Sequence, residues 1–151
     1  MKRTRLARKS KSPVAKCKDR IQALLREIAI ERDGGCVLRL YPEAGQCGGY
    51  GPKSGKLILQ AEHLNTRERT ISYGDMRNIV CLCQRHHGYF KQQYGALYWD
   101  LIRKHIGEER WAWLQRVIAD RKTYNMTLWD WEKVEIALKQ DLLDEQKAKM
   151  I

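Results

Sequence analysis

The stretch Asn78–Lys91, NIVCLCQRHHGYFK, decides the fold because it places two cysteines and two adjacent histidines in one short segment. The letters NIVCL predict a short buried strand, and QRHHGYFK predicts the start of a helix despite Gly88. Thiolate and imidazole are ligands that transition metals prefer, and the spacing of Cys83 and His86 lets both face one ion. The segment therefore predicts a strand-to-helix turn that binds a metal.

Two cysteines upstream can complete a tetrahedral site. Cys36 and Cys47 lie in a glycine-rich segment that predicts a loop, and with Cys83 and His86 they form a Cys3His set suited to structural zinc. The separation of Cys36 from Cys47 exceeds the usual spacing of about two to four residues in a zinc knuckle. Cys81 is a competing fourth ligand, because strand alternation predicts that it shares a face with Cys83. The alternative is that these thiols pack as small hydrophobic groups.

Hydrophobic periodicity predicts the neighbouring elements. Apolar residues between Ile21 and Ile28 repeat with helical spacing, and the pair Gly34-Gly35 predicts where that helix ends. Residues 56–62 predict a strand, followed by a polar connection to the second strand. The expected order is helix, loop, strand, connection, strand, helix.

Beyond residue 93 the pattern predicts helices only. One apolar stripe ends near Gly107, and a second begins at Trp111. The spacing of the five tryptophans favours packing in the core over stacking on nucleic-acid bases. These residues are Trp99, Trp111, Trp113, Trp129 and Trp131.

The last helix has a defined start. Thr127 with Asp130 three residues later predicts a capping box. Glu135 and Lys139 predict an ion pair on the exposed side of this helix.

Positive charge is concentrated at the N-terminus. Residues 1–20 contain nine Lys or Arg against the single acid Asp19, so they carry +8 of the net charge of +11. With few apolar residues and no periodicity, this arm is expected to be disordered and to bind a polyanion, although a solubilising tail or a targeting peptide has the same composition. The nucleic-acid-binding candidates are Lys2, Arg3, Arg5, Arg8, Lys9 and Lys11.

Cysteine usage and hydropathy indicate the compartment. Five cysteines, an odd number, favour thiols or metal ligands over a disulfide framework. No apolar run approaches the length of a membrane span, and no apolar stretch follows the basic N-terminus. We therefore expect a cytoplasmic protein without a membrane partner.

Four polar residues occur in an order that suits phosphodiester hydrolysis. Glu62 and His63 end the first predicted strand, Asn78 opens the second, and His87 lies in the following helix. A divalent ion such as Mg²⁺ or Mn²⁺ needs carboxylate or imidazole ligands with open positions, and a neutral imidazole beside it can accept a proton from water. We expect the four side chains to converge.

The segments AEHL and RNIVCLCQRHH resemble the two halves of the HNH, or ββα-metal, nuclease motif. The resemblance implies that His63 is the general base, that Asn78 fixes the loop holding that base, and that His87 binds the catalytic ion. Glu62 stands where many members have an aspartate or histidine ligand. Cysteines that flank the motif in this family form zinc knuckles, as Cys36, Cys47, Cys83 and His86 would here.

The helical end, YWDLIRKHIGEERWAWLQRVI followed by LWDWEKVEIALKQDLL, resembles the bacteriophage NinG or Rap recombination proteins. This resemblance implies a metal-dependent endonuclease that acts on branched or single-stranded DNA in the cytoplasm of a bacterial host. Other hypotheses are a homing or packaging HNH nuclease and a non-catalytic zinc-stabilised module that binds nucleic acid. A homodimer is compatible with either class.

The expected fold class is α+β. A small ββα-metal unit with a zinc knuckle is preceded by a helix and followed by a helical region packed on it. The expected parts are a basic arm (1–20), the nuclease core (21–92) and the C-terminal helical extension (93–151).

Overall fold

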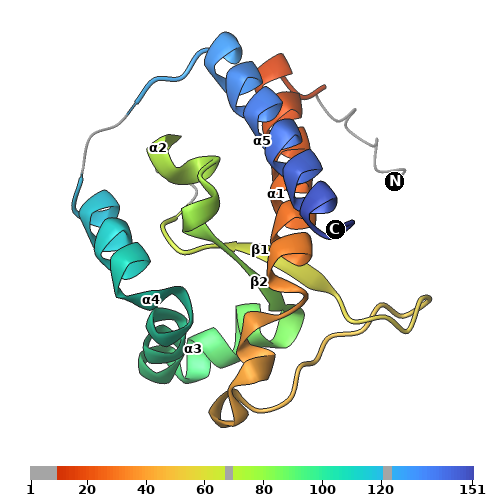
Figure 1. Cartoon of the computed structure of the whole chain (residues 1–151), viewed down its shortest axis with the longest axis vertical. Helices are drawn as coiled ribbons and strands as arrows, with labels where there is room; N and C mark the ends of the chain where they lie inside the picture. Colours follow the sequence, from red (N-terminus) through yellow and green to blue (C-terminus); the bar gives the residue numbers. More distant parts are fainter. Residues whose placement is uncertain (1–9, 67–69, 121–123) are drawn as a thin grey trace, which may run out of the picture.

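A two-stranded antiparallel sheet lies at the centre of the fold, with helices on both sides (Figure 1). The computed structural model describes residues 10–66, 70–120 and 124–151. Strand β1 (Leu59–His63) pairs with β2 (Ile79–Cys83), and Leu59 lies opposite Cys83. The sheet with its flanking helices confirms the predicted α+β class, and the two strands lie close to their expected positions.

Helix α1 (Pro13–Asp33) begins earlier than the composition of the arm suggested. Ser12 caps its N-terminus by accepting a hydrogen bond from Ala15 N–H, and a proline at the first turn is already in a helical conformation. Residues 13–20 of the expected disordered arm are therefore helical, while residues 1–9 lie outside the described ranges. Gly34, with φ of 65°, ends the helix as predicted.

Helices α1 and α5 (Leu128–Ala148) lie side by side and cover one side of the sheet (Figure 1). The predicted capping box of Thr127 and Asp130 is present at the start of α5. The buried residues of this cluster come from both helices and both strands, and include Ile21, Leu25, Ile28, Ala61, Ile79, Trp131 and Leu138. Burial of these side chains supplies the main attraction between the helices and the sheet.

Glu135 lies inside the α1–α5 contact, which corrects the expectation of an exposed ion pair. Its pair with Lys139 forms at 2.9 Å, but the Glu135 side chain is only 8% exposed. Arg20 of α1 donates to both carboxylate oxygens, and the Cys17 thiol lies 3.4 Å from Oε2. Hydrogen bonds from Arg20 and Lys139 lower the pKa of Glu135 to about 2.

Helix α4 (Gly95–Ala119) packs on the other side of the sheet, together with the short α3 (Lys91–Gln93). Gly107, with φ of 81° and ψ of 164°, interrupts the helical backbone inside α4, so the two predicted helices are present and meet at this kink. The expectation that all tryptophans enter the core holds fully only for Trp131. Trp99, Trp111 and Trp113 are partly buried, whereas Trp129 is 65% exposed.

The remaining elements are short turns that shape the connections. Segment 36–55 contains two 3₁₀ turns, η1 (Val37–Leu40) and η2 (Pro42–Ala44). The polar connection between the strands contains α2 (Thr70–Tyr73) and η3 (Met76–Asn78). A π-helical turn, η4 (His86–Phe90), joins β2 to α3.

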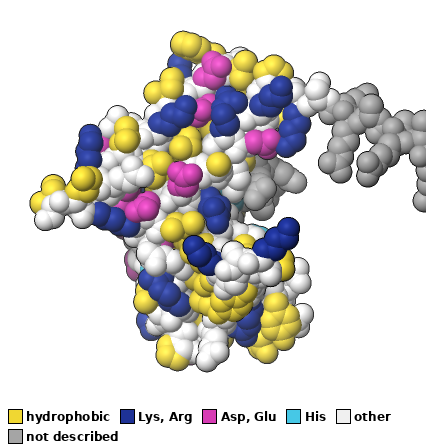
Figure 2. All heavy atoms as spheres, turned by 90° about the vertical axis from the view of Figure 1, so that its right-hand side faces the viewer, with side chains coloured by type: hydrophobic (Ala, Val, Ile, Leu, Met, Phe, Trp, Pro, Cys, Tyr) yellow, Lys and Arg dark blue, Asp and Glu magenta, His cyan; other side chains and the backbone are white. Residues whose placement is uncertain are grey.

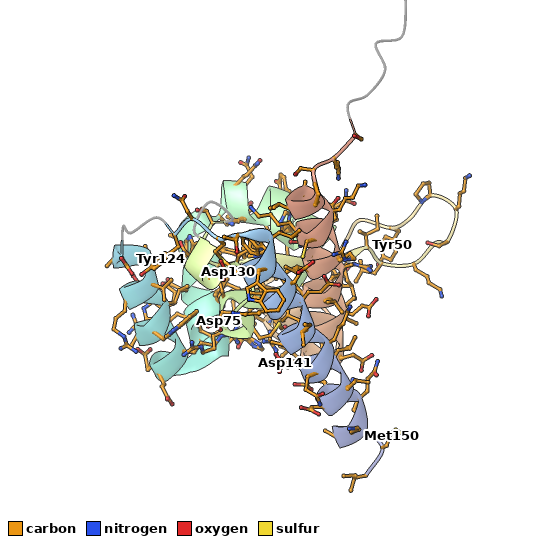
Figure 3. The ribbon with its side chains drawn as sticks, turned by 90° about the horizontal axis from the view of Figure 1, so that it is seen from above. Tyr50, Asp75, Tyr124, Asp130, Asp141 and Met150 are labelled. Atoms are coloured by element: carbon orange, nitrogen blue, oxygen red, sulfur yellow. The ribbon has the colours of Figure 1, made fainter. Side chains whose placement is uncertain are left out.

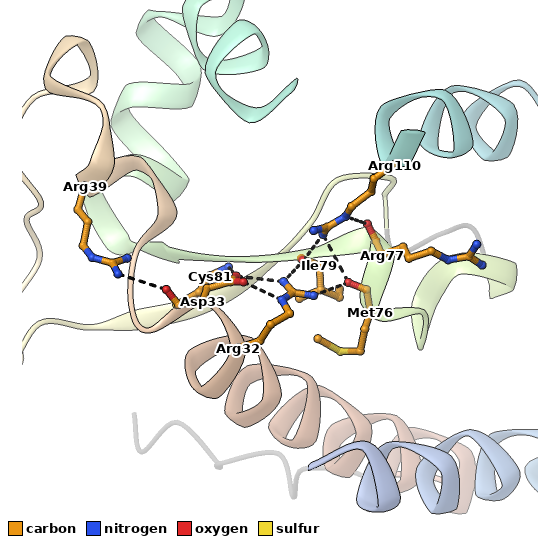
Figure 4. A network of polar contacts seen from close by, with 8 residues as sticks. All are labelled: Arg32, Asp33, Arg39, Met76, Arg77, Ile79, Cys81 and Arg110. Carbon is orange, nitrogen blue, oxygen red and sulfur yellow. Dashed lines mark hydrogen bonds and ion pairs between the residues drawn. The ribbon is translucent and has the colours of Figure 1, made fainter. Parts of the chain in front are cut away.

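Two arginines from opposite sides of the sheet bind the backbone at the start of β2 (Figure 4). Arg32 of α1 donates to the carbonyl oxygens of Met76 and Ile79, and Arg110 of α4 donates to those of Arg77 and Ile79. Burial lowers the pKa of Arg110 to about 10, which leaves the guanidinium charged at neutral pH. These bonds fix the backbone on both sides of Asn78.

The described surface carries mixed charge. On the face drawn in Figure 2, Lys and Arg side chains are interspersed with Asp and Glu. Within residues 10–66, 70–120 and 124–151, none of the helices has the length and hydropathy needed to cross a bilayer.

The ion pairs of Glu135 predict a pH-dependent contribution to stability. Because its pKa is lowered from 4.5 to about 2, the contribution is complete above pH 4.5 and is lost as the pH falls toward 2. We expect Glu135→Gln to lower the free energy of unfolding at pH 7 by roughly 1–3 kcal/mol, and the difference from wild type to close by about pH 2. Urea unfolding between pH 7 and about pH 2 measures the loss of stability and its pH dependence. The exposed Asp141→Asn is the control. A difference that persists unchanged at pH 2 would contradict the assignment.

Candidate functional site

Three cysteines and one histidine converge at one end of the sheet. The ligand atoms of Cys36, Cys47, Cys83 and His86 all lie within 4.8 Å of one another. The three Sγ atoms lie 3.2, 3.9 and 3.3 Å from Nδ1 of His86, in the order Cys36, Cys47 and Cys83. This is the Cys3His set that the sequence predicted, and it can hold a structural metal ion such as zinc.

The ring of His86 is oriented for metal binding. Its Nε2 lies 3.0 Å from the carbonyl oxygen of Ala44, an acceptor, so Nε2 carries the hydrogen and Nδ1 keeps its lone pair toward the cysteines. Burial lowers the pKa of His86, which favours the neutral ring that binds metals. The donor set and the histidine tautomer therefore both fit a metal ion.

The thiols differ in how readily they ionise. Burial raises the pKa of Cys36, and it raises that of Cys47 to about 12. At Cys83 burial also acts to raise the pKa, but hydrogen bonds from the N–H groups of Gly48 and His86 lower it on balance. The Cys83 thiol thus ionises more readily than those of Cys36 and Cys47.

Cys81 does not join the cluster, which settles the choice of fourth ligand within the described residues. It packs with Ile79 and Ala61 against α1, whereas Cys83 packs on the other side of the sheet. The predicted shared face is wrong because Cys83 ends β2 where the chain turns into η4. Burial raises the pKa of Cys81 to about 12, as expected for a thiol that fills the core.

The four side chains that were expected to converge do not form one cluster. Glu62 and His87 meet in a second polar cluster, whereas His63 and Asn78 bind the segment that follows β1. The Glu62 side chain is 5% exposed, and Nε2 of His87 lies 2.7 Å from its Oε2. Lys91, one helical turn after His87, forms an ion pair with Oε1. Burial alone would raise the pKa of Glu62, but the bonds from His87 and Lys91 lower it on balance.

Sequence reasoning missed Lys91 and Tyr98. The Tyr98 ring is buried beside Glu62, and burial together with the neighbouring carboxylate raises the pKa of its hydroxyl. The signal for Lys91 was its position four residues after His87, which puts both on one helix face. No comparable signal marks Tyr98, because it belongs to an apolar helical stripe.

Asn78 and His63 both bind the segment that follows β1. Asn78 Oδ1 accepts a hydrogen bond from Asn65 N–H at 2.6 Å, and its Nδ2 donates to the carbonyl oxygens of Asn65 and Ser72. Nε2 of His63 lies 3.1 Å from the carbonyl oxygen of Tyr73. One loop is therefore held both by the asparagine and by the predicted base.

The two polar clusters contact different elements. Glu62 and His63 are adjacent in β1, so their side chains leave opposite faces of the strand. Glu62 points toward η4 and α3, where it meets His87 and Lys91. The His63 ring packs against Tyr73, with 4.9 Å between ring centroids.

Six basic residues of the N-terminal arm are the predicted DNA contacts. Lys2, Arg3, Arg5, Arg8 and Lys9 lie outside the described residues. Lys11 is exposed and forms an ion pair with Asp19 at 2.5 Å.

One cavity lies beside the turn that precedes Asn78. It has a volume of about 790 Å³ and lies between the turn at Asp75 and α5. Its lining carries mixed charge, with the carboxylates of Asp75, Asp130 and Asp141 (Figure 3) and the cations of Arg77 and Lys133.

Comparisons with known proteins add no relatives. No protein-family model, curated protein or solved structure matches the chain. Functional assignment therefore depends on the residues and their geometry.

The Cys3His cluster predicts about one tightly bound transition-metal ion per chain. We expect Cys83→Ala to lose this ion and to unfold at a markedly lower temperature, because segment 36–47 is no longer joined to β2 and η4. Elemental analysis with thermal unfolding measures both effects. Cys81→Ala is the matched control and should retain the ion. A folded wild-type protein without metal would contradict the site.

Proposed function

We propose that the chain is a metal-dependent DNA endonuclease of the HNH type that hydrolyses phosphodiester bonds. The observation that carries this proposal is the contact between Glu62 and His87, two of the motif residues, together with the loop that His63 and Asn78 both bind. The order of these residues, in β1, at the end of η3 and in η4, supports the same assignment.

His63 serves as the general base in this proposal. Because the carbonyl oxygen of Tyr73 accepts a hydrogen bond from its Nε2, the nitrogen that would accept the proton is Nδ1, which is buried in this structure. A neutral ring can take a proton from water as the water oxygen bonds to phosphorus and the bond to the 3′ oxygen breaks. By likeness to the family, the product carries a 5′ phosphate. Asn78 supports this step by holding the loop that fixes the tautomer of His63.

Glu62 and His87 would hold the divalent ion, Mg²⁺ or Mn²⁺. One carboxylate and one imidazole leave coordination positions for water and phosphate oxygens, which fits a catalytic rather than a structural ion. When bound, the ion would neutralise charge on the phosphate and the departing oxygen. Glu62 is buried and ionised, which suits it as a ligand.

We assign zinc to the Cys3His cluster. Three thiols and one imidazole in tetrahedral number form a structural zinc set with no open position. This ion would tie segment 36–47 to β2 and η4, and so would support the turn that carries His87.

DNA is the proposed partner, with the basic arm as its main electrostatic contact. Branched DNA is the substrate that the resemblance to NinG or Rap proteins favours.

The ion pair between Glu62 and Lys91 favours a second candidate, a non-catalytic zinc-stabilised binding module, because the predicted metal ligand already has a cationic partner.

The decisive assay is nicking of supercoiled plasmid and cutting of a four-way junction with Mg²⁺ or Mn²⁺. We expect wild type to cut, and His63→Ala to lose at least about 100-fold in rate while still binding DNA, because water then lacks its base. His105→Ala, which changes a histidine of α4 outside the motif, is the control. Unchanged cleavage by His63→Ala would show that His63 is not the general base. DNA binding without cleavage by either protein, whatever the metal, would select the binding module.

Deleting residues 1–11 tests the arm while leaving the Ser12 cap in place. Six basic residues are lost, so DNA affinity should fall and its dependence on salt should flatten, since fewer counterions are released. Fluorescence anisotropy over a salt series measures both. Equal affinity and slope in the truncated protein would show a passive tail.

A further inference from the structure

Lys91 places a positive charge directly at the candidate metal ligand. Its Nζ forms an ion pair with Oε1 of Glu62, and His87 occupies Oε2 at 2.7 Å. Both carboxylate oxygens therefore have a donor. Because Glu62 is buried, these two donors stabilise its charge in place of water.

Two aromatic rings help to position the ammonium group. Nζ lies 5.4 Å from the ring centroid of Tyr98 and 5.8 Å from that of Trp99. Ring faces attract a cation over such distances. The Lys91 side chain is nevertheless 34% exposed, so the ammonium group has a route to solvent.

A divalent ion that binds Glu62 must replace this ammonium group, because two cations at one buried carboxylate repel each other. A lysine suits such an exchange, since its charge is compact and its four-carbon stem is flexible. The stem can move between two acceptors without a shift of the helix. A phosphate group of a bound nucleic acid is the natural second acceptor.

We propose that Lys91 is a resident cation that competes with the divalent ion for Glu62 and releases the carboxylate when its ammonium group binds a phosphate of the substrate. This inference rests on the proposed nuclease function. It makes ion binding and phosphate binding mutually favourable, because each favours the state in which Lys91 has left Glu62. The site is then kept closed to the ion until nucleic acid arrives.

The test measures Mn²⁺ binding to the full chain in the absence of nucleic acid, from the electron paramagnetic resonance signal of free Mn²⁺. Lys91→Met keeps the stem but removes the charge, and its dissociation constant for Mn²⁺ should be lower than that of wild type by about tenfold or more. Adding Glu62→Gln to Lys91→Met should abolish this gain, which assigns the ion to Glu62.

Lys104→Met is the matched control. Lys104 is an exposed lysine of α4 whose Nζ lies 5.5 Å from the ring centroid of Tyr41. The same loss of charge at this position should leave Mn²⁺ affinity unchanged. A gain equal to that of Lys91→Met would show a general charge effect and would overturn the proposal.

A second measurement uses wild type alone. It therefore tests whether Mn²⁺ displaces Lys91 from Glu62 even if Lys91→Met does not fold. An amine-reactive reagent, read out by mass spectrometry, should label Lys91 faster at saturating Mn²⁺ than in its absence, while labelling of Lys104 stays constant. Constant labelling of Lys91 would overturn the proposal, as would an unchanged Mn²⁺ affinity in folded Lys91→Met. Neither readout depends on cleavage. Failure of the nicking assay with both shifts present would reject the nuclease and retain the ion exchange.

Discussion

Five residue pairs join β1 to β2, from Leu59 opposite Cys83 to His63 opposite Ile79. This register determines which side chains meet, because a shift by one residue would turn every side chain of β1 to the other face. Glu62 would then lie against the α1 side of the sheet, and His63 would approach η4 and α3. The separation of the two polar clusters is thus a property of the strand pairing.

The arginines that bind the start of β2 reinforce this register from both sides. Arg32 and Arg110 donate to carbonyl oxygens that strand pairing does not use, so this end of β2 is held without a third strand. Asn78 lies between these bonded carbonyls and in turn holds Asn65 and Ser72. Hydrogen bonds from α1 and α4 therefore fix the start of β2, and Asn78 at that position fixes the loop that binds His63.

The sequence predicted best where residue chemistry and spacing act together. The α+β class, the helix end at Gly34, the capping box at Thr127 and the Cys3His set follow from local patterns, and the structure has all of them. Local patterns also indicated that Glu62 and His87 would meet, because they end or follow adjacent elements of one small motif.

Contacts between residues far apart in the sequence were not predicted by these local patterns. Glu135 forms its local pair with Lys139, yet Arg20, more than a hundred residues earlier in the chain, draws it into a buried contact. Cys81 and Cys83 pack on different sides of the sheet because Cys83 is the last residue of β2, where the chain turns toward η4. Lys91 was overlooked because its partner Glu62 lies on another element. The outcomes for Glu135 and Lys91 each depend on a partner that no local window contains.

The contact between α1 and α5 also joins the first described helix to the last. During synthesis α1 leaves the ribosome before α5, the helix that packs beside it. Folding must therefore close a loop of nearly the whole chain, which lowers the folding rate. Until that step the uncovered face of α1 is available to chaperones. The α1–α5 contact thus forms only after every segment between these two helices has been synthesised.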